Sequence, residues 1–297
     1  TQTRIEEALL EREDVPSEKR DDWEEVQNYI QAMNRAVEAL DELPFSTRLI
    51  RETHRVLMQG VRGQNKQPGE FRTSQNWIGG ATIRDAVFVP PVHTSIPDLM
   101  SDLEEFVHNE DVFVPELLKI AIVHYQFETI HPFLDGNGRV GRLLITLYLV
   151  ERGILKRPIL YLSDFFERNR THYYDNLMRV REKNDIVQWL KFFLVGVIET
   201  AKSGIDTFDA ILKLQEDVDA LVEPLGRRAE NARKVIRALY ERPLTDAERV
   251  SNITDLSMTA SYNLIDAMED IGVLKEITGA KRNRLYLFER YTKLFTP

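Results

Sequence analysis

Hydrophobic residues in the first part of the chain recur at separations of three and four. From Trp23 to Leu40 this spacing predicts an amphipathic helix, which Pro44 ends. Ser46 then stands where an N-cap is expected, and the apolar positions of Leu49–Met58 continue the same spacing. Leu99–Val107 has a similar pattern. These segments are expected to lie on the surface of a helical core.

Two later segments are apolar at nearly every position. Glu116–Ile130 and Leu143–Val150 carry few polar residues, and Gly153 follows the second as a C-terminal cap. A helix that is apolar on all sides is buried, so both are predicted to lie at the centre of the protein.

A short stretch between the helical segments is different. Trp77–Gly80 and Ala86–Val89 contain β-branched and aromatic residues with turn residues between them, and Pro90-Pro91 closes the stretch. This pattern predicts a small β-hairpin or extended flap within an otherwise helical protein. A surface loop is the alternative.

The C-terminal part is predicted to form a smaller unit. Asn184–Val222 reads as one long helix or two shorter ones, and the pattern breaks at Pro224-Leu225-Gly226. Three helices and two strand-like runs then make a winged helix-turn-helix. The segments are Ala232–Tyr240, a helix opened by a capping box at Thr245–Glu248, a helix capped by Ser257, and the strands Val273–Ile277 and Leu285–Phe288.

These patterns give a mainly α-helical fold in three parts. We expect an N-terminal helical region at 1–42, a helical core at 43–222 and the winged helix-turn-helix domain at 223–297. The core is predicted to be a helical bundle that carries the hairpin flap.

Composition excludes several classes of protein. The 297 residues carry a formal net charge of -9, so the whole chain has no basic field for nucleic acid or anionic lipid. Without cysteine there are no disulfides, zinc thiolates or thiol nucleophiles, which fits a cytoplasmic protein. No apolar run is long enough to span a membrane. The chain begins at Thr1, and we expect that an upstream segment has been removed.

The segment His131–Arg142 concentrates the chemistry, and it lies between the two most apolar helices. Pro132 ends the first helix and leaves His131 at its exit. Gly136, Asn137 and Gly138 tolerate positive φ, so backbone N–H groups can converge on an anion, and the next helix adds its own free N–H groups.

The charged residues of the same segment fit a bound polyphosphate. Arg139 and Arg142 are three apart at a helix start, where cations are unfavourable unless an anion lies between them. Asp135 offers a hard oxygen ligand for Mg²⁺, and His131 can take a proton from a hydroxyl. A plain turn is the alternative, but a turn needs neither arginine.

The segment resembles the signature of the Fic (filamentation induced by cAMP) family, His-Pro-Phe-x-Asp/Glu-Gly-Asn-Gly-Arg-x-x-Arg. Every fixed position is matched, and the resemblance extends over roughly 43–197, including Pro68–Arg72, the flap and Thr171–Tyr174. An appended winged helix also occurs in bacterial members of the family.

The resemblance implies a protein adenylyltransferase that moves AMP from ATP to a Ser, Thr or Tyr hydroxyl of a target protein. His131 would be the general base, and Asp135 would hold Mg²⁺. The phosphates would be bound by Gly136, Asn137, Gly138, Arg139 and Arg142, with Asn137 also using its side chain. Phe133 would anchor the loop, and the flap would align the target by strand addition.

Further family features are matched in part. Tyr174 occupies a position that lines the adenine pocket, whereas Tyr173 is expected in the core. Arg181 stands where some members carry an asparagine that contacts adenine, which bears on base selectivity. Thr3–Ala8 imperfectly matches an inhibitory motif, Ser/Thr-x-x-x-Glu-Gly/Asn, whose Glu pairs with the second arginine. We expect the true motif to lie upstream of Thr1.

Other functions stay open at this stage. The C-terminal unit could bind DNA through Ser257–Ile271 and a basic wing, although 230–297 holds 11 Lys+Arg against 10 Asp+Glu, so protein docking is an equal alternative. The chain could also form a homodimer.

Relatives that move UMP, phosphocholine or phosphate form a third alternative, which the intact Gly136–Arg139 run disfavours. The other histidines, including His124, are expected to be structural.

Overall fold

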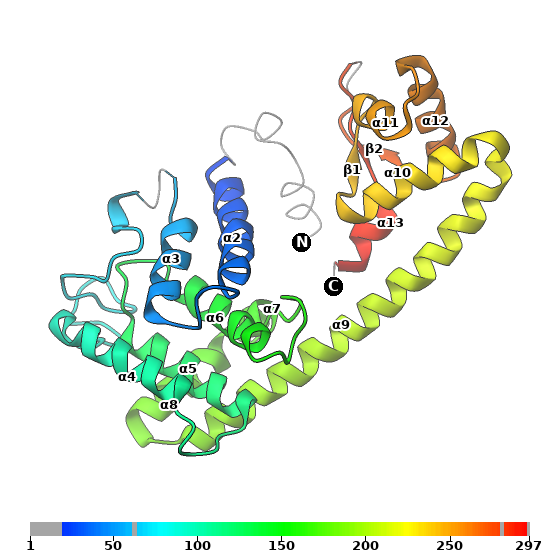
Figure 1. The fold of residues 1–297 in the computed structure, drawn as a ribbon. Helices are drawn as coiled ribbons and strands as arrows, with labels where there is room; N and C mark the ends of the chain where they lie inside the picture. The colour runs from blue at the N-terminus through cyan, green and yellow to red at the C-terminus, as the bar shows by residue number, and fades with distance from the viewer. Residues whose placement is uncertain (1–19, 61–63, 280–281, 296–297) are drawn as a thin grey trace. The chain divides into compact units, whose positions relative to one another are not determined.

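The structure, a computed structural model, describes residues 20–60, 64–279 and 282–295, and these form two units (Figure 1). One unit contains Asp21–Gly204, and the other contains the described residues from Ile205 onward. The division falls within the long helix α9 (Ile186–Val222), which is one continuous helix rather than two. Among the described helices, none is long and apolar enough to cross a membrane.

The first unit is built almost entirely of helices. In chain order they are α2 (Arg20–Ala39), α3 (Thr47–Leu57), η2 (Gln64–Lys66), η3 (His93–Ser95), α4 (Ile96–His108), α5 (Glu116–Ile130), α6 (Asn137–Glu151), α7 (Ser163–Arg168), α8 (Arg170–Lys183) and the start of α9. The predicted cap of α3 is confirmed, since the Ser46 side chain accepts a hydrogen bond from the Leu49 N–H.

The two apolar helices form the centre of this unit, as predicted. α5 spans the predicted residues, and α6 begins six residues earlier than its apolar run because its first two turns carry the glycines and arginines of the loop. Fully buried residues of both helices, such as Val123 and Leu144, belong to one continuous core. The sequence analysis did not predict α7 and α8, which are short or mostly polar.

The flap is extended, but its two arms pair at a single point. Ile78 and Phe88 form one antiparallel β-bridge, and their backbone N–H groups each donate to the other's carbonyl, at 2.8 and 3.1 Å. Between the arms, the Asp85 carboxylate accepts hydrogen bonds from the backbone N–H groups of Ala81 and Thr82. The predicted hairpin is therefore a looped flap without a strand ladder.

The second unit combines helices with a small sheet. After η4 (Glu223–Arg228) come α10 (Ala229–Glu241), β1 (Leu244–Thr245), α11 (Ala247–Thr254), α12 (Met258–Asp270), β2 (Lys275–Glu276), β3 (Tyr286–Leu287), α13 (Glu289–Thr292) and η5 (Lys293–Phe295). The three strands are antiparallel in the order β1-β3-β2. They pack with α10, α11 and α12 around a second apolar core.

One predicted cap in this unit was wrong. Asp246, not Thr245, caps α11, and its side chain accepts from the Arg249 N–H. Thr245 pairs with Tyr286 in the sheet, so its backbone is committed to the extended strand β1. The predicted cap at Ser257 is confirmed, because its hydroxyl accepts from the Ala260 N–H.

Candidate active site

The loop between α5 and α6 fixes His131 in an unusual backbone conformation. α5 ends at Ile130, and His131 is left-handed, with φ 50° and ψ 60°. Its N–H donates to the Phe127 carbonyl, and its own carbonyl accepts from Arg72 Nε at 3.0 Å. Left-handed residues other than glycine are held by their surroundings and concentrate at functional sites.

The surroundings of His131 keep its ring neutral. Burial lowers the pKa of the imidazole to about 4, the nearby arginines Arg72 and Arg181 lower it further, and the Glu128 backbone and Asp135 act in the opposite direction. At neutral pH the ring is therefore unprotonated and can accept a proton. The tertiary structure thus moves the pKa of this imidazole well below the usual value of a histidine.

His54 packs against the loop and holds it in place, a role that sequence reasoning missed. Its ring stacks on Phe133, with centroids 3.7 Å apart and planes 5° from parallel. Nδ1 accepts from the Gly69 N–H at 2.8 Å, so Nε2 carries the proton and donates to the Asp135 carbonyl at 3.1 Å. Phe133 is fully buried, which confirms its expected anchoring role.

The Asn137 side chain is used inside the loop. Its Oδ1 accepts from the Phe133 N–H at 2.9 Å, and its Nδ2 donates to the Phe133 carbonyl at 2.8 Å. The side chain is 2% exposed. The resemblance implied a phosphate contact through this side chain, but both of its polar atoms are already engaged, which leaves the backbone N–H of Asn137 for a ligand.

The start of α6 is a candidate anion site. Gly136 precedes it in a left-handed conformation, with φ 77°, and within the described residues no side chain caps the helix. A Cβ at this glycine would lie 2.8 Å from Met58 Sδ, so only glycine fits. The uncapped N–H groups and the positive end of the helix dipole favour a bound phosphate.

Asp135 and Arg139 lie beside this helix start. The Asp135 side chain is 51% exposed, and its Oδ1 accepts from the Gly136 N–H at 2.6 Å. Mg²⁺ is commonly held by one or two carboxylates together with phosphate oxygens, so one exposed carboxylate fits the ion. Arg139 lies 4.0 Å from Asp135 and 3.4 Å from Glu25 of α2.

Arg142 is the second arginine of the segment. Among the described residues it makes no hydrogen bond or ion pair, but its charge lowers the pKa of Glu128 and of Tyr29 on α2, both of which burial raises. A Cβ on Gly138 would come within 3.2 Å of its Nη1. Its guanidinium therefore lies against the first turn of α6.

Two arginines connect the flap to the loop. Arg72, 2% exposed, donates to the carbonyls of His131, Ser74 and Pro91, and its N–H donates to the Pro132 carbonyl. Arg181 of α8 stacks on the flap residue Phe88 at 3.8 Å and donates to the Glu128 carbonyl at 3.2 Å. Arg181, which stands where some Fic members carry an asparagine, therefore holds the flap in place through Phe88.

The two tyrosines of α8 have different environments. Tyr173 is buried, and its hydroxyl bonds with His124 Nε2 at 2.9 Å, while His124 Nδ1 bonds with the Gly141 carbonyl at 2.9 Å. His124 and Tyr173 are thus core residues. Tyr174 is 47% exposed, so its ring is accessible from outside.

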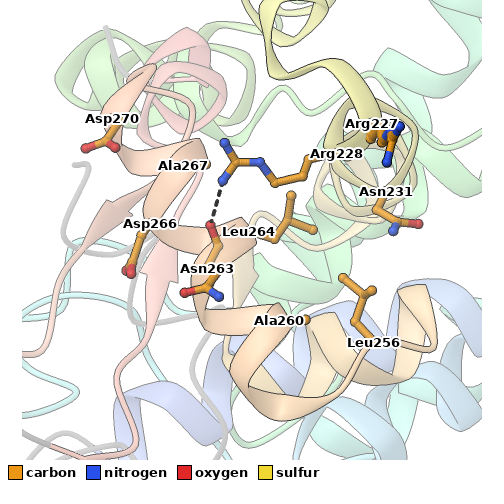
Figure 2. A pocket seen from close by; sticks show the side chains of 10 residues that line it. All are labelled: Arg227, Arg228, Asn231, Leu256, Ala260, Asn263, Leu264, Asp266, Ala267 and Asp270. Atoms are coloured by element: carbon orange, nitrogen blue, oxygen red, sulfur yellow. Dashed lines mark hydrogen bonds between the residues drawn. The ribbon is translucent and has the colours of Figure 1, made fainter.

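A cavity of about 620 Å³ in the second unit contains none of these residues (Figure 2). It lies between the start of α10 and α12, where Arg228 Nη1 donates to the Asn263 carbonyl at 3.5 Å. Its lining carries two arginines and two aspartates, so its charges balance. The lining residues are Arg227, Arg228, Asn231, Leu256, Ala260, Asn263, Leu264, Asp266, Ala267 and Asp270.

The structure brings His131, Asp135, Gly136–Gly138, Arg139 and Arg142 together around one loop and one helix start, with the flap fastened beside it. Thr3–Ala8 lies outside the described residues, so the inhibitory motif has no structural account here. Among the described residues no group of three or more His, Asp or Glu side chains gathers as a metal site.

These features describe a mainly helical protein with one candidate site at the α5–α6 loop, and comparison with known proteins shows what the chain is similar to. Residues 44–149 match the model of the Fic/DOC family. Over this stretch the chain is similar to the Fic/DOC family and to proteins named protein adenylyltransferase Fic.

Two curated relatives illustrate the match. The protein adenylyltransferase Fic of Aedes aegypti is 32% identical over 125 residues, which is 42% of this chain and 22% of the relative. A probable protein adenylyltransferase of Aquifex aeolicus is 31% identical over 155 residues, 50% of this chain and 44% of the relative. The chain thus spans less than half the length of either.

Solved structures share the fold. A Fic family protein from Desulfovibrio desulfuricans G20 matches 97% of this chain and 83% of its own, with a TM-score of 0.56 and 20% identity. A Fic domain containing signalling protein from Bacteroides thetaiotaomicron matches 64% of this chain and 73% of its own, with a TM-score of 0.52 and 23% identity. The mainly helical Fic fold is therefore confirmed.

Proposed function

We propose that the chain is a protein adenylyltransferase that moves AMP from ATP to a hydroxyl of a target protein. The observation that carries the proposal is the position of a neutral, buried imidazole beside an uncapped helix start with two arginines. The homology to named adenylyltransferases supports it.

The reaction follows from the placement of these groups. His131 takes the proton of the acceptor hydroxyl, whose oxygen then bonds to the α-phosphorus of ATP as the bond to the bridging oxygen breaks and pyrophosphate leaves. When bound, Mg²⁺ supplies charge neutralisation on the phosphates, and Asp135 is the residue that would hold it. Arg139, Arg142 and the first N–H groups of α6 hold the phosphates in place.

The flap is proposed to align the target. Its arms carry exposed apolar side chains, among them Trp77, Val87 and Val89, and they are joined at the Ile78–Phe88 bridge without a continuous strand ladder. An extended segment with unused backbone groups is suited to strand addition by another chain. Tyr174, exposed on α8, is proposed to contact the adenine ring by stacking.

Labelling with α-labelled ATP tests the function. The chain, Mg²⁺ and a cell lysate should give labelled protein bands, and His131→Ala should reduce their rate of formation by about 10²–10⁴-fold. His172→Ala, which removes an exposed histidine of α8, is the matched control and should label normally. Equal labelling by His131→Ala would refute the assigned base. Label from γ-labelled ATP instead would indicate phosphate transfer.

The second unit is proposed to be a winged helix-turn-helix that docks protein rather than DNA. The order α10, β1, α11, α12, β2, β3 is that of such a domain. Its exposed third helix, α12, carries acidic residues and neither lysine nor arginine, which disfavours entry into a DNA groove. On the wing side, Lys275 already pairs with Glu289 at 2.6 Å.

A gel shift at several salt concentrations separates these alternatives. We expect no complex of the full chain with duplex DNA at 50 mM salt, because residues 230–297 are nearly neutral in charge. A salt-sensitive complex that Arg282→Ala and Arg284→Ala weaken would instead establish DNA binding through the wing.

A further inference from the structure

Glu128 is a buried carboxyl that the proposed reaction does not use. It lies on α5, three residues before His131, and is 7% exposed. Among the described residues its Oε1 has no hydrogen-bond partner. A Cβ on Gly141 would lie 2.5 Å from that oxygen, and one on Gly138 3.9 Å from it. The carboxyl therefore packs directly against the first two turns of α6.

Charged and titratable groups face this carboxyl from three helices. Arg142 comes from α6, and Arg181 and Tyr173 come from α8. On its own helix α5, His124 lies one turn earlier and is bonded on both ring nitrogens. Burial raises the pKa of the Glu128 carboxyl to about 7, against the lowering effects of Arg142 and Arg181. Near neutral pH, Glu128 is thus close to its titration midpoint.

We propose that Glu128 is a positioning residue for nucleotide binding, whose carboxylate balances the Arg142 guanidinium in the free protein and takes up a proton when a polyphosphate binds. The proposal rests on the function proposed above, since it needs a phosphate ligand at α6.

The charge balance at Arg142 carries this inference. In the described part of the chain no carboxylate forms an ion pair with Arg142, whose charge lowers the pKa of the Glu128 carboxyl against the effect of burial. A polyphosphate at the same guanidinium adds negative charge close to Glu128. A nearby like charge disfavours the ionised form, so a carboxyl near its midpoint becomes protonated. Proton uptake and nucleotide binding are then linked.

A purely structural role gives a different expectation. If Glu128 only fills the space beside Gly141, Glu128→Gln keeps the shape and should leave the pH dependence of binding unchanged. If its charge matters, the same substitution removes the proton uptake while the packing stays. Glu151→Gln is the matched control, because Glu151 is a poorly exposed carboxyl at the far end of α6 whose Oε1 accepts from the Phe45 N–H at 2.7 Å.

Titration calorimetry with Mg²⁺ and ATP on the full chain tests the proposal. Binding is measured from pH 6 to 8.5 in buffers of different ionisation enthalpy, which gives the number of protons taken up. For the wild type we expect proton uptake near pH 7 and an affinity that falls as pH rises, by at most about tenfold per pH unit. Glu128→Gln should lose both effects and bind more tightly than wild type at pH 8.

The controls separate the possible failures. Titration of the nucleotide itself is common to all variants and cancels in the comparison. Glu151→Gln should behave as wild type, and Glu128→Asp, which restores a carboxyl, should recover the pH dependence. A wild type that binds without proton uptake, or a Glu128→Gln that retains it, overturns this inference alone. A wild type that binds no ATP at any pH overturns the proposed function as well.

Discussion

Three histidines of this protein have pKa values that depend on burial more than on their immediate partners. His54, His124 and His131 all have a pKa of about 4, and burial is the largest cause in each case. Two of the three, His54 and His124, use both ring nitrogens in hydrogen bonds and so act as neutral structural groups. His131 is the one of these three whose imidazole belongs to the loop itself.

The neutral state of His131 predicts how the labelling rate depends on pH below neutrality. Because its pKa is lowered to about 4, the base stays unprotonated from pH 7.5 down to about pH 5.5. Labelling rates at saturating ATP should therefore not fall between these values as they would for a histidine with a pKa of 6.5. Initial rates in a series of buffers give the profile, and a midpoint near 6.5 would contradict the assignment.

The ion pair between Glu25 and Arg139 predicts a modest effect on nucleotide binding. Glu25 Oε2 lies 3.4 Å from Arg139 Nη1, and both side chains are partly exposed. Such pairs contribute about 0–1 kcal/mol, so Glu25→Ala should tighten ATP binding by up to about fivefold as it releases the guanidinium.

Glu38→Ala is the control for that change, since it removes the same charge from an exposed position of the same helix. Equilibrium binding of both variants at two salt concentrations provides the comparison. Weaker binding by Glu25→Ala would mean that Glu25 holds Arg139 in its binding position instead of competing with phosphate.

At the scale of elements, the junction between α5 and α6 depends on glycine. Gly136 gives the left-handed turn that lets α6 begin, and Gly141 allows α5 to approach so closely that a Cβ would overlap Glu128 Oε1. The flap is fixed to this junction by Arg72, whose three side-chain hydrogen bonds end on backbone carbonyls. The loop, the start of α6 and the flap are therefore held together by direct contacts.

Gly136→Ala should displace the loop, because it adds a steric contact to the strain of a left-handed backbone. A left-handed alanine costs about 1–2 kcal/mol, and here its Cβ would also meet Met58 Sδ at 2.8 Å. Gly153→Ala is the matched control, because its φ is 67° and nothing lies within 4 Å of its Cβ. Both should lower the free energy of unfolding, whereas only Gly136→Ala should also abolish ATP binding. Equal binding by the two variants would argue against a fixed loop.

At the scale of the whole molecule, the two units can be followed separately. All three tryptophans, Trp23, Trp77 and Trp189, lie in the unit that holds the candidate site. Tryptophan fluorescence during unfolding therefore reports on that unit, while circular dichroism reports on both. Chains with two units need not unfold in one step, so separate signals are needed to assign any change in stability.

The buried histidines predict that the first unit loses stability in acid. Each has a pKa that folding lowers from 6.5 to about 4, so the unfolded chain binds protons first as pH falls through this window. Stability is full above pH 6.5 and declines toward pH 4, with about 3 kcal/mol at most from His124. Glu128 has a raised pKa, so its contribution to the stability of the folded state increases as pH falls from about 7 to 4.5.

Urea unfolding monitored by tryptophan fluorescence at pH 7 and pH 5 measures this effect. The midpoint should be lower at pH 5 for the wild type. Glu128→Gln should show a steeper fall, because it lacks a carboxyl whose pKa is raised by folding. A midpoint that rises at pH 5 would show that the histidines are not held neutral.

The sequence by itself determined the helices whose boundaries depend on local chemistry and the segment that carries the candidate site. The span of α5 and the caps at Ser46 and Ser257 follow from apolar spacing and short-range hydrogen bonds, which a one-dimensional pattern records. Only the tertiary structure decided the cap at Asp246, the engaged side chain of Asn137, the support by His54 and the lowered pKa of His131. These depend on contacts between distant segments, such as Thr245 with Tyr286 and His54 with Asp135, and burial and strand pairing are properties of the folded chain rather than of any local stretch.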